Sequence, residues 1–173
     1  GTINYVEGAV GSRVQPLAHA SYDAWIKAYR PNENSSNTTM SYYSRGQAIA
    51  SLLDAKIIAN TNGKKRLDHF MQHLYKKFYI KKDRGFTEDE FRNELSSFAK
   101  ENLDEFFSRY INGTEIPPYK EVFEKIGVNV KYTGSSAPSF GATLRQSGGK
   151  LIVSRVRSNS SCEDAGISVN DEI

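Results

Sequence analysis

The sequence has one cysteine, no long apolar run and almost no excess of either charge. Its single cysteine, Cys162, excludes an internal framework of disulfides. No run of about 18 apolar residues is present, which excludes a transmembrane helix. Lysine and arginine number 23 against 20 aspartate and glutamate, a formal net charge of +3. This balance argues against a nucleic-acid-binding protein and against an acidic tail.

No basic and apolar leader opens the chain at Gly1, so we expect that any signal peptide was removed or never existed. The length of 173 residues is large for one typical domain and small for two. The chain ends on an apolar residue, Ile173, with no sign of a helix or strand ending there. We therefore expect a piece of a longer protein. The content of 38% hydrophobic and 12% aromatic residues is enough to build a core.

Apolar residues recur at helical spacing up to about residue 127, which predicts a compact helical domain over residues 1–127. Pro16 can open a first helix that continues to about Arg30, and a polar loop follows. Thr87 and Glu90 have the spacing of a capping box, so a helix should begin there. The other expected helices contain residues 43–60, 67–78, 103–110 and 122–126.

From Val128 onward the pattern changes to short β-rich segments. Strands are predicted at residues 128–132, 140–145 and 151–156, with a turn at residues 147–149. The expected fold class is therefore mainly α: a compact multi-helix domain followed by a partial β region over residues 128–173.

His69 and His73 have the i, i+4 spacing of a zinc-ligand pair on one helix face. A zinc-peptidase motif needs a glutamate directly after the first histidine, and Phe70 stands there. Phe70 fits the apolar stripe of the helix, so we interpret this segment as structural and expect no metal site.

Tyr42 and Tyr43 precede Ser44, Arg45 and Gly46 at the start of the strongest predicted helix. A tyrosine there can direct its hydroxyl at a site and donate a hydrogen bond to the oxyanion of a tetrahedral intermediate. Gly46 would let a substrate approach closely. Taken alone, the same pair is more often a core tyrosine beside a surface one.

Four blocks resemble the glycyl aminopeptidase family of zinc metallopeptidases, in the same order and with similar spacing. The resemblance covers roughly residues 10–127, and the blocks are residues 22–31 (YDAWIKAYRP), 41–54 (SYYSRGQAIASLLD), 84–88 (RGFTE) and 106–114 (FFSRYINGT). It implies a thermolysin-like catalytic domain followed by a helical region and a PDZ domain. It also implies that Tyr43, with Tyr42 as the fallback, matches the oxyanion-stabilising tyrosine of a Tyr-x-Lys-Gly element. Arg45 stands where lysine is common.

The chain has no His-Glu-x-x-His motif, which departs from the family pattern. We therefore expect zinc in the parent enzyme, held by residues upstream of Gly1, and none bound to this fragment. The fragment alone should be inactive.

The end of the chain resembles the first half of a PDZ domain. Ser139, Phe140, Gly141 and Ala142 stand where the carboxylate-binding loop lies, and Leu144 continues the strand that pairs with a peptide. The helix that forms the second wall of such a groove would come after the last residue. We expect the half-built domain to leave apolar residues such as Ile152 and Ile173 uncovered, which would allow pairing between copies through the incomplete sheet.

The leading hypothesis is the C-terminal part of a zinc-dependent aminopeptidase that hydrolyses peptide bonds near the substrate N-terminus. Its expected partners are a peptide substrate and a peptide or protein C-terminus at the PDZ part, with no nucleic acid and no membrane span. The alternative is a non-catalytic interaction module in which the helices are a scaffold for PDZ-type peptide binding. The family resemblance favours a bacterial periplasmic or other extracytoplasmic setting, which the residues themselves do not establish.

Overall fold

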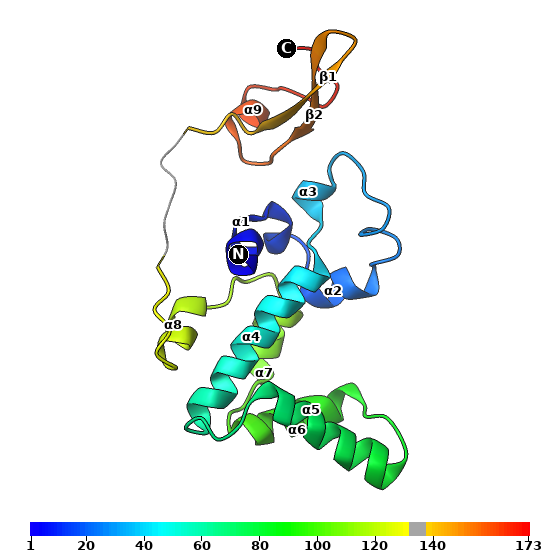
Figure 1. The fold of residues 1–173 in the computed structure, drawn as a ribbon. Coiled ribbons are helices and arrows are strands. Elements are labelled where there is room, and N and C mark those ends of the chain that lie inside the picture. Colours follow the sequence, from blue (N-terminus) through cyan, green and yellow to red (C-terminus); the bar gives the residue numbers. More distant parts are fainter. Residues whose placement is uncertain (132–137) are drawn as a thin grey trace. The chain divides into compact units, whose positions relative to one another are not determined.

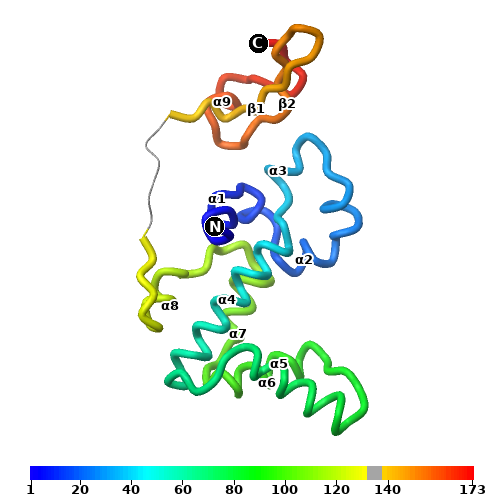
Figure 2. The backbone as a smooth tube through the Cα atoms, in the orientation of Figure 1, coloured from blue at the N-terminus to red at the C-terminus, as the bar shows by residue number. Residues whose placement is uncertain are grey.

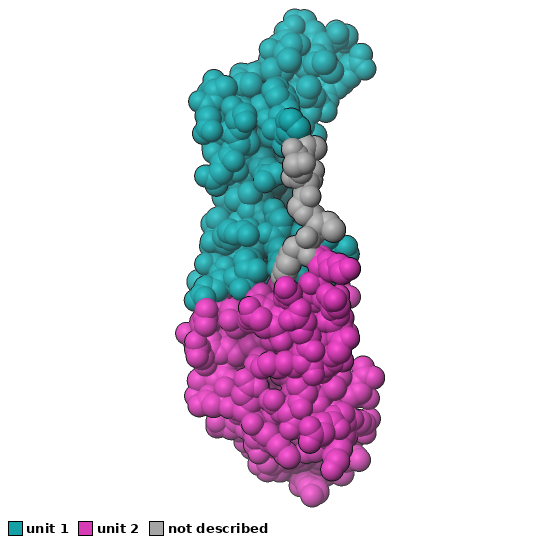
Figure 3. Space-filling view, turned by 90° about the vertical axis from the view of Figure 1, so that its left-hand side faces the viewer, with its two compact units in different colours: residues 1–45, 114–116, 133–173 teal, residues 46–113, 117–132 magenta. Residues whose placement is uncertain are grey.

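The computed structural model describes residues 1–131 and 138–173 (Figure 1). The fold is mainly α with one small antiparallel sheet after the helices, which confirms the predicted fold class. The chain divides into two compact units, coloured separately in Figure 3. Unit 1 contains residues 1–45, 114–116 and 133–173, and unit 2 contains residues 46–113 and 117–132.

The helical part of unit 1 is built from short elements. The predicted helix to Arg30 is wrong in its second half, because the helix ends at Tyr22 and turns follow. The N–H of Ile26 bonds to the carbonyl of Asp23, three residues back, and the Trp25 side chain is 79% exposed. Helical spacing alone did not hold this segment in a helix: within the described residues Ala24 is buried, but Trp25 and Ile26 remain 79% and 73% exposed. The elements are α1 (Thr2–Gly8), η1 (Val10–Arg13), α2 (Leu17–Tyr22) and α3 (Ser35–Thr38).

The predicted polar loop after Pro31 contains the short helix α3. The side-chain oxygen of Asn32 accepts the backbone N–H of Asn34 and the hydroxyl of Ser35, which bends the chain into this turn. The buried side chain of Asn37 then reaches beyond the helix.

The longest helix is α4 (Tyr42–Asn60), as the sequence predicts. The hydroxyl of Ser41 accepts the N–H of Ser44 and caps the helix start. At its other end Gly63, with φ +74°, donates its N–H to the carbonyl of Ile58 and closes the last turn. The boundary between the units falls inside α4, after Arg45.

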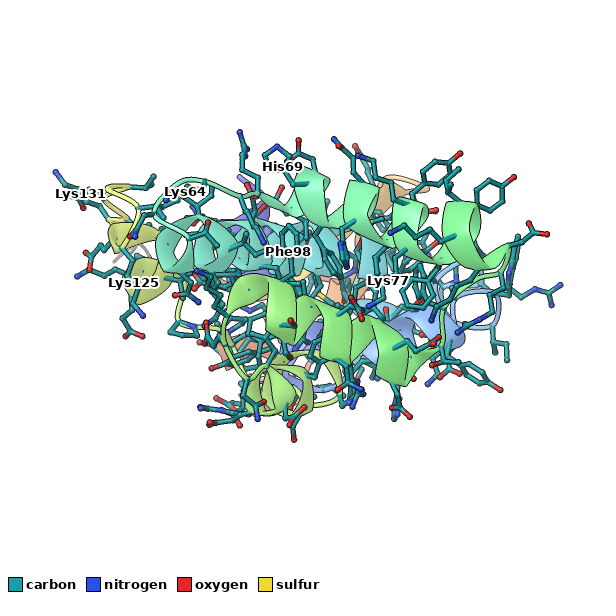
Figure 4. The ribbon with its side chains drawn as sticks, turned by 90° about the horizontal axis from the view of Figure 1, so that it is seen from below. Lys64, His69, Lys77, Phe98, Lys125 and Lys131 are labelled. Atoms are coloured by element: carbon teal, nitrogen blue, oxygen red, sulfur yellow. The ribbon has the colours of Figure 1, made fainter. Side chains whose placement is uncertain are left out.

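Unit 2 is helical around an aromatic core, and Figure 4 shows Phe98 between its helices. The buried Phe70 ring packs against Phe91 and Phe98, with ring centroids 5.5 and 5.4 Å apart. The capping box is confirmed: Thr87 Oγ1 accepts the N–H of Glu90 at 3.2 Å, and the Glu90 carboxylate accepts the N–H of Thr87 at 2.9 Å. Besides most of α4, the elements are α5 (Leu67–Leu74), the π-helical η2 (Tyr75–Ile80), α6 (Glu88–Ala99), α7 (Asp104–Phe106), the π-helical η3 (Phe107–Ile111) and α8 (Tyr119–Glu124).

The β part of unit 1 is a hairpin of β1 (Ala142–Ser147) and β2 (Lys150–Val156). Gly148 and Gly149 form its turn with φ of +60° and +81°, which glycine adopts without strain. After α9 (Ser161–Asp164) the chain returns beside β2, a path that Figure 2 traces. There the N–H of Val153 donates to the carbonyl of Asp171 at 2.8 Å.

The first predicted strand is wrong where the structure describes it, because residues 128–131 form no strand. The N–H of Val128 instead donates to the carbonyl of Phe123 and closes α8, with Gly127 at a φ of +81°. Tyr132, the last residue of that predicted strand, lies outside the described residues. The second predicted strand is shifted, from residues 140–145 to Ala142–Ser147, and the third is confirmed within one residue.

Candidate functional site

Three tyrosine hydroxyls meet at the start of α4, and we call Tyr29, Tyr42 and Tyr43 the tyrosine cluster. The Tyr29 hydroxyl lies 2.9 Å from that of Tyr42 and 3.2 Å from that of Tyr43. The rings of Tyr42 and Tyr43 pack together with centroids 4.2 Å apart. Tyr43 is 68% exposed, whereas Tyr42 is half-buried. The sequence singled out the two neighbouring tyrosines but missed Tyr29, since no local pattern indicates that the chain after α2 returns to α4.

Hydrogen bonding makes the two phenols of α4 chemically different. The bond with Tyr29, together with that to Tyr43, raises the pKa of Tyr42 above its ordinary value. The hydrogen bonds of Tyr43 with Tyr29 and then with Tyr42 lower its pKa. A more acidic phenol is the stronger hydrogen-bond donor toward a developing negative charge. Tyr43 is therefore both the more exposed hydroxyl and the better suited to stabilise an oxyanion.

Arg45 fixes the first turn of α4 in place. Its side chain is buried, and Nη1 donates to the carbonyls of Ser12 at 2.6 Å and Gln15 at 3.2 Å. Nη2 donates to the carbonyl of Glu115 at 3.4 Å. The family resemblance places Arg45 where lysine is common, and arginine keeps the positive charge. The structure adds that its guanidinium donors join the first turn of α4, which also carries Tyr42 and Tyr43, to the backbone at Ser12, Gln15 and Glu115.

Unit 1 contains a cavity of about 800 Å³ into which this cluster opens. Three of the residues expected to bind a peptide, Ser139, Gly141 and Ala142, line the same cavity as Tyr42 and Tyr43. The structure thus brings the sequence-predicted oxyanion donor and most of the predicted carboxylate loop to one place.

Two of the predicted peptide-binding residues lie elsewhere. Phe140 and Leu144 do not line the cavity, and their side chains are 51% and 37% exposed. Between them Gly141 has a φ of +87°, and a Cβ added there would lie 2.3 Å from the Cβ of Ser160. The loop conformation therefore requires glycine at this position.

The described residues do not fit a zinc site. Across residues 1–131 and 138–173, no group of three or more histidine, cysteine, aspartate or glutamate side chains is placed to hold a metal ion. His69 lies on the outer side of α5 (Figure 4), where its Nδ1 accepts the N–H of Arg66. His73 bonds through Nε2 to Glu94 at 2.8 Å, and the same carboxylate pairs with Lys77. Phe70 between them is fully buried, as its place in the apolar stripe predicts.

None of the helices in the described ranges combines the length and apolar character that crossing a membrane requires.

Comparison with known proteins gives two similarities. The first 49 residues match the model of the M61 glycyl aminopeptidase family. A crystal structure of an aminopeptidase N family protein from Idiomarina loihiensis matches with a TM-score of 0.82 and 28% identity. The match covers 99% of this chain and 32% of that protein, so the chain spans about a third of its length. No curated protein matches.

The matched residues 1–49 include the whole tyrosine cluster and Arg45. The solved structure extends the similarity over nearly all of the present chain. The chain is thus similar to the M61 glycyl aminopeptidases over its first 49 residues and to an aminopeptidase N family protein over nearly its whole length.

Proposed function

We propose that this chain is the C-terminal part of a zinc-dependent aminopeptidase and supplies its oxyanion-stabilising tyrosine. The observation that carries the proposal is the Tyr43 hydroxyl, which is exposed at the first turn of α4, open to a cavity and hydrogen-bonded to Tyr29. This tyrosine lies in the segment that matches the M61 glycyl aminopeptidases.

In the proposed reaction, water attacks the carbonyl carbon of a peptide bond, and the carbonyl oxygen becomes an oxyanion. The Tyr43 hydroxyl donates a hydrogen bond to this oxygen, and the charge is stabilised most when it is fully developed. Tyr29 holds the phenol and Arg45 holds the helix start, so little reorganisation is needed during the reaction. Because the described residues do not fit zinc, the metal and the general base would come from other residues of the whole protein. The chain alone is then inactive.

We also propose that the hairpin region binds peptide in the manner of a PDZ domain. Within the described residues β1 pairs only with β2, so its other edge is open to an added strand. Ser139, Phe140, Gly141 and Ala142 would form the loop that receives the chain end, and Leu144 would contact the added strand.

The test of the catalytic role is Tyr43→Phe in the whole protein, assayed on short peptides. Loss of the hydroxyl should lower kcat by roughly 10²–10³ with a smaller effect on KM. Tyr22→Phe is the matched control, because Tyr22 is 90% exposed and does not line the cavity. An unchanged kcat for Tyr43→Phe, with the loss seen in Tyr42→Phe, would move the role to Tyr42. Unchanged kcat in both would overturn the proposal.

The open edge of β1 also favours a second function, a non-catalytic peptide-binding module. The same assay distinguishes the two. A whole protein that binds peptides but releases no N-terminal amino acid, with zinc supplied, would support the binding module.

A further inference from the structure

The charged residues that line the cavity beside the tyrosine cluster are all positive. Among the described residues that line it, Arg155 and Arg157 are the two with charged side chains, and none is an aspartate or glutamate. Both arginines are exposed, and within the part of the chain that the structure describes neither guanidinium forms an ion pair. The cavity therefore offers two positive charges without counter-charges, which favours an anionic ligand.

The backbone places both arginines at the cavity. Arg155 lies on β2 opposite Thr143, and the N–H of Arg157 donates to the carbonyl of Gly141 at 2.8 Å. Since the two residues are separated by one position in an extended segment, they share one side of it. Thr143 and Gly141 line the same cavity.

A buried amide fixes this segment against the helical part of unit 1. Asn37 Nδ2 donates to the carbonyl of Val156 at 2.8 Å, and Asn37 Oδ1 accepts the N–H of Ser158 at 3.0 Å. These bonds involve the residues directly after Arg155 and Arg157. The backbone that carries the two guanidinium groups is thus positioned independently of any ligand.

We propose that Arg155 and Arg157 form a subsite for the C-terminal carboxylate of a short peptide substrate, an inference that rests on the proposed function. Guanidinium groups bind carboxylates through paired N–H donors, more strongly than neutral donors do. A cavity of about 800 Å³ is of the size that holds a small ligand. The tyrosine cluster in the same cavity supplies a donor for a peptide carbonyl, so one short peptide can meet both groups.

The experiment uses the whole protein and three matched peptides. The first has a free C-terminal carboxylate, the second is its C-terminal amide, and the third is an amide that carries one aspartate. A side-chain carboxylate and a C-terminal carboxylate have the same chemistry. The third peptide therefore tests whether the site binds any carboxylate or only the one at the chain end. Steady-state kinetics and calorimetric binding are both measured, so that binding is read even if hydrolysis fails.

The free-carboxylate peptide should bind and react about tenfold better than its amide. The double variant Arg155→Gln/Arg157→Gln should lose this preference, whereas Arg145→Gln, which alters an exposed arginine of β1 outside the cavity lining, should keep it.

Equal binding of the first two peptides would overturn the subsite, and so would a preference that survives in the double variant. Tighter binding of the aspartate amide than of the free carboxylate would overturn the assignment to the chain end. Preferential binding without any hydrolysis would support the subsite and contradict the proposed function instead.

Discussion

Asn37 donates its side-chain N–H to the carbonyl of Val156, 119 residues further along the chain, at 2.8 Å. The oxygen of the same amide accepts the N–H of Ser158 at 3.0 Å. Asn37 is 8% exposed, so both bonds are shielded from water. One amide therefore joins α3 to the end of β2 within unit 1.

We predict that Asn37→Ala lowers the free energy of unfolding by about 1–3 kcal/mol. The reason is that the backbone groups of Val156 and Ser158 lose partners that water replaces poorly. Urea unfolding measures the change. Asn34→Ala is the matched control, since it removes only the local bond from Asn37 Nδ2 to Asn34 Oδ1. A cost for Asn37→Ala no larger than for this control would contradict the role given to Asn37.

Tyr29→Phe should change the pH dependence of catalysis in the whole protein. The hydrogen bond with Tyr29 is the largest cause of the lowered pKa of Tyr43. Without it the pKa of Tyr43 returns toward its ordinary value, so the donor keeps its proton to higher pH. We expect the alkaline limb of the kcat profile to move upward, while Tyr22→Phe leaves it in place. An alkaline limb that stays fixed or moves to lower pH in Tyr29→Phe would refute this positioning role.

The variant Gly46→Ala should affect the stability of the fold and the access of substrate in opposite directions. In the structure a Cβ added at Gly46 meets no described atom within 4 Å, and the residue lies inside α4. The substitution should therefore raise the free energy of unfolding by about 0.5–1 kcal/mol, because alanine favours a helix. If the substrate approaches closely there, as the sequence predicts, kcat/KM of the whole protein should fall.

Gly63→Ala is the control for Gly46→Ala. Gly63 has a φ of +74°, so alanine there should destabilise the fold. Full activity in a stabilised Gly46→Ala variant would show that the substrate does not pass this residue.

Acid unfolding should reveal the charge of Glu90, which pairs with Arg84 at 2.6 Å beside the start of α6. The hydrogen bond from Arg84, followed by that from the Thr87 N–H, lowers the pKa of Glu90 from 4.5 to about 2. A carboxyl with a lowered pKa in the folded state stabilises the fold above its unfolded pKa. That contribution is lost as the pH falls from 4.5 toward 2.

The measurement is the unfolding midpoint of the wild type and of Glu90→Gln across that pH range. Their difference should be largest near neutral pH and shrink below pH 4.5. Glu88→Gln, in the same helical turn, leaves the capping box intact. A difference between wild type and Glu90→Gln that does not vary with pH would refute the assignment.

The sequence predicted elements well where a strong pattern coincides with local chemistry. The helix over residues 43–60 has an apolar stripe and a glycine stop, and the capping box of Thr87 and Glu90 is purely local. The segment around Trp25 has helical spacing in the sequence, yet it forms turns in which the Trp25 side chain is 79% exposed. Residues 128–131 alternate like a strand, yet Val128 closes α8, and no strand in the described ranges pairs with them.

The candidate site was partly visible in the sequence. The sequence singled out Tyr42 and Tyr43 because a hydroxyl pair at a helix start has an evident chemical use. The third member, Tyr29, and the arginines of the cavity were missed, since no spacing in the sequence relates them to α4. The zinc-like spacing of His69 and His73 does not produce a site in the described residues, because no group of three or more possible ligands comes together there.

The sequence by itself determined the helix-rich composition of the fold, the hairpin turn and the lack of a disulfide framework. These follow from periodicity, glycine conformation and cysteine number, which are local properties. Only the tertiary structure decided that Tyr29 bonds to Tyr43, that Arg45 is buried and that Asn37 holds the backbone beside Arg155 and Arg157. Those contacts join segments that are separated in the chain, which local sequence patterns do not specify. For Arg45 and Asn37, which are buried, the exclusion of water by packing also strengthens the hydrogen bonds.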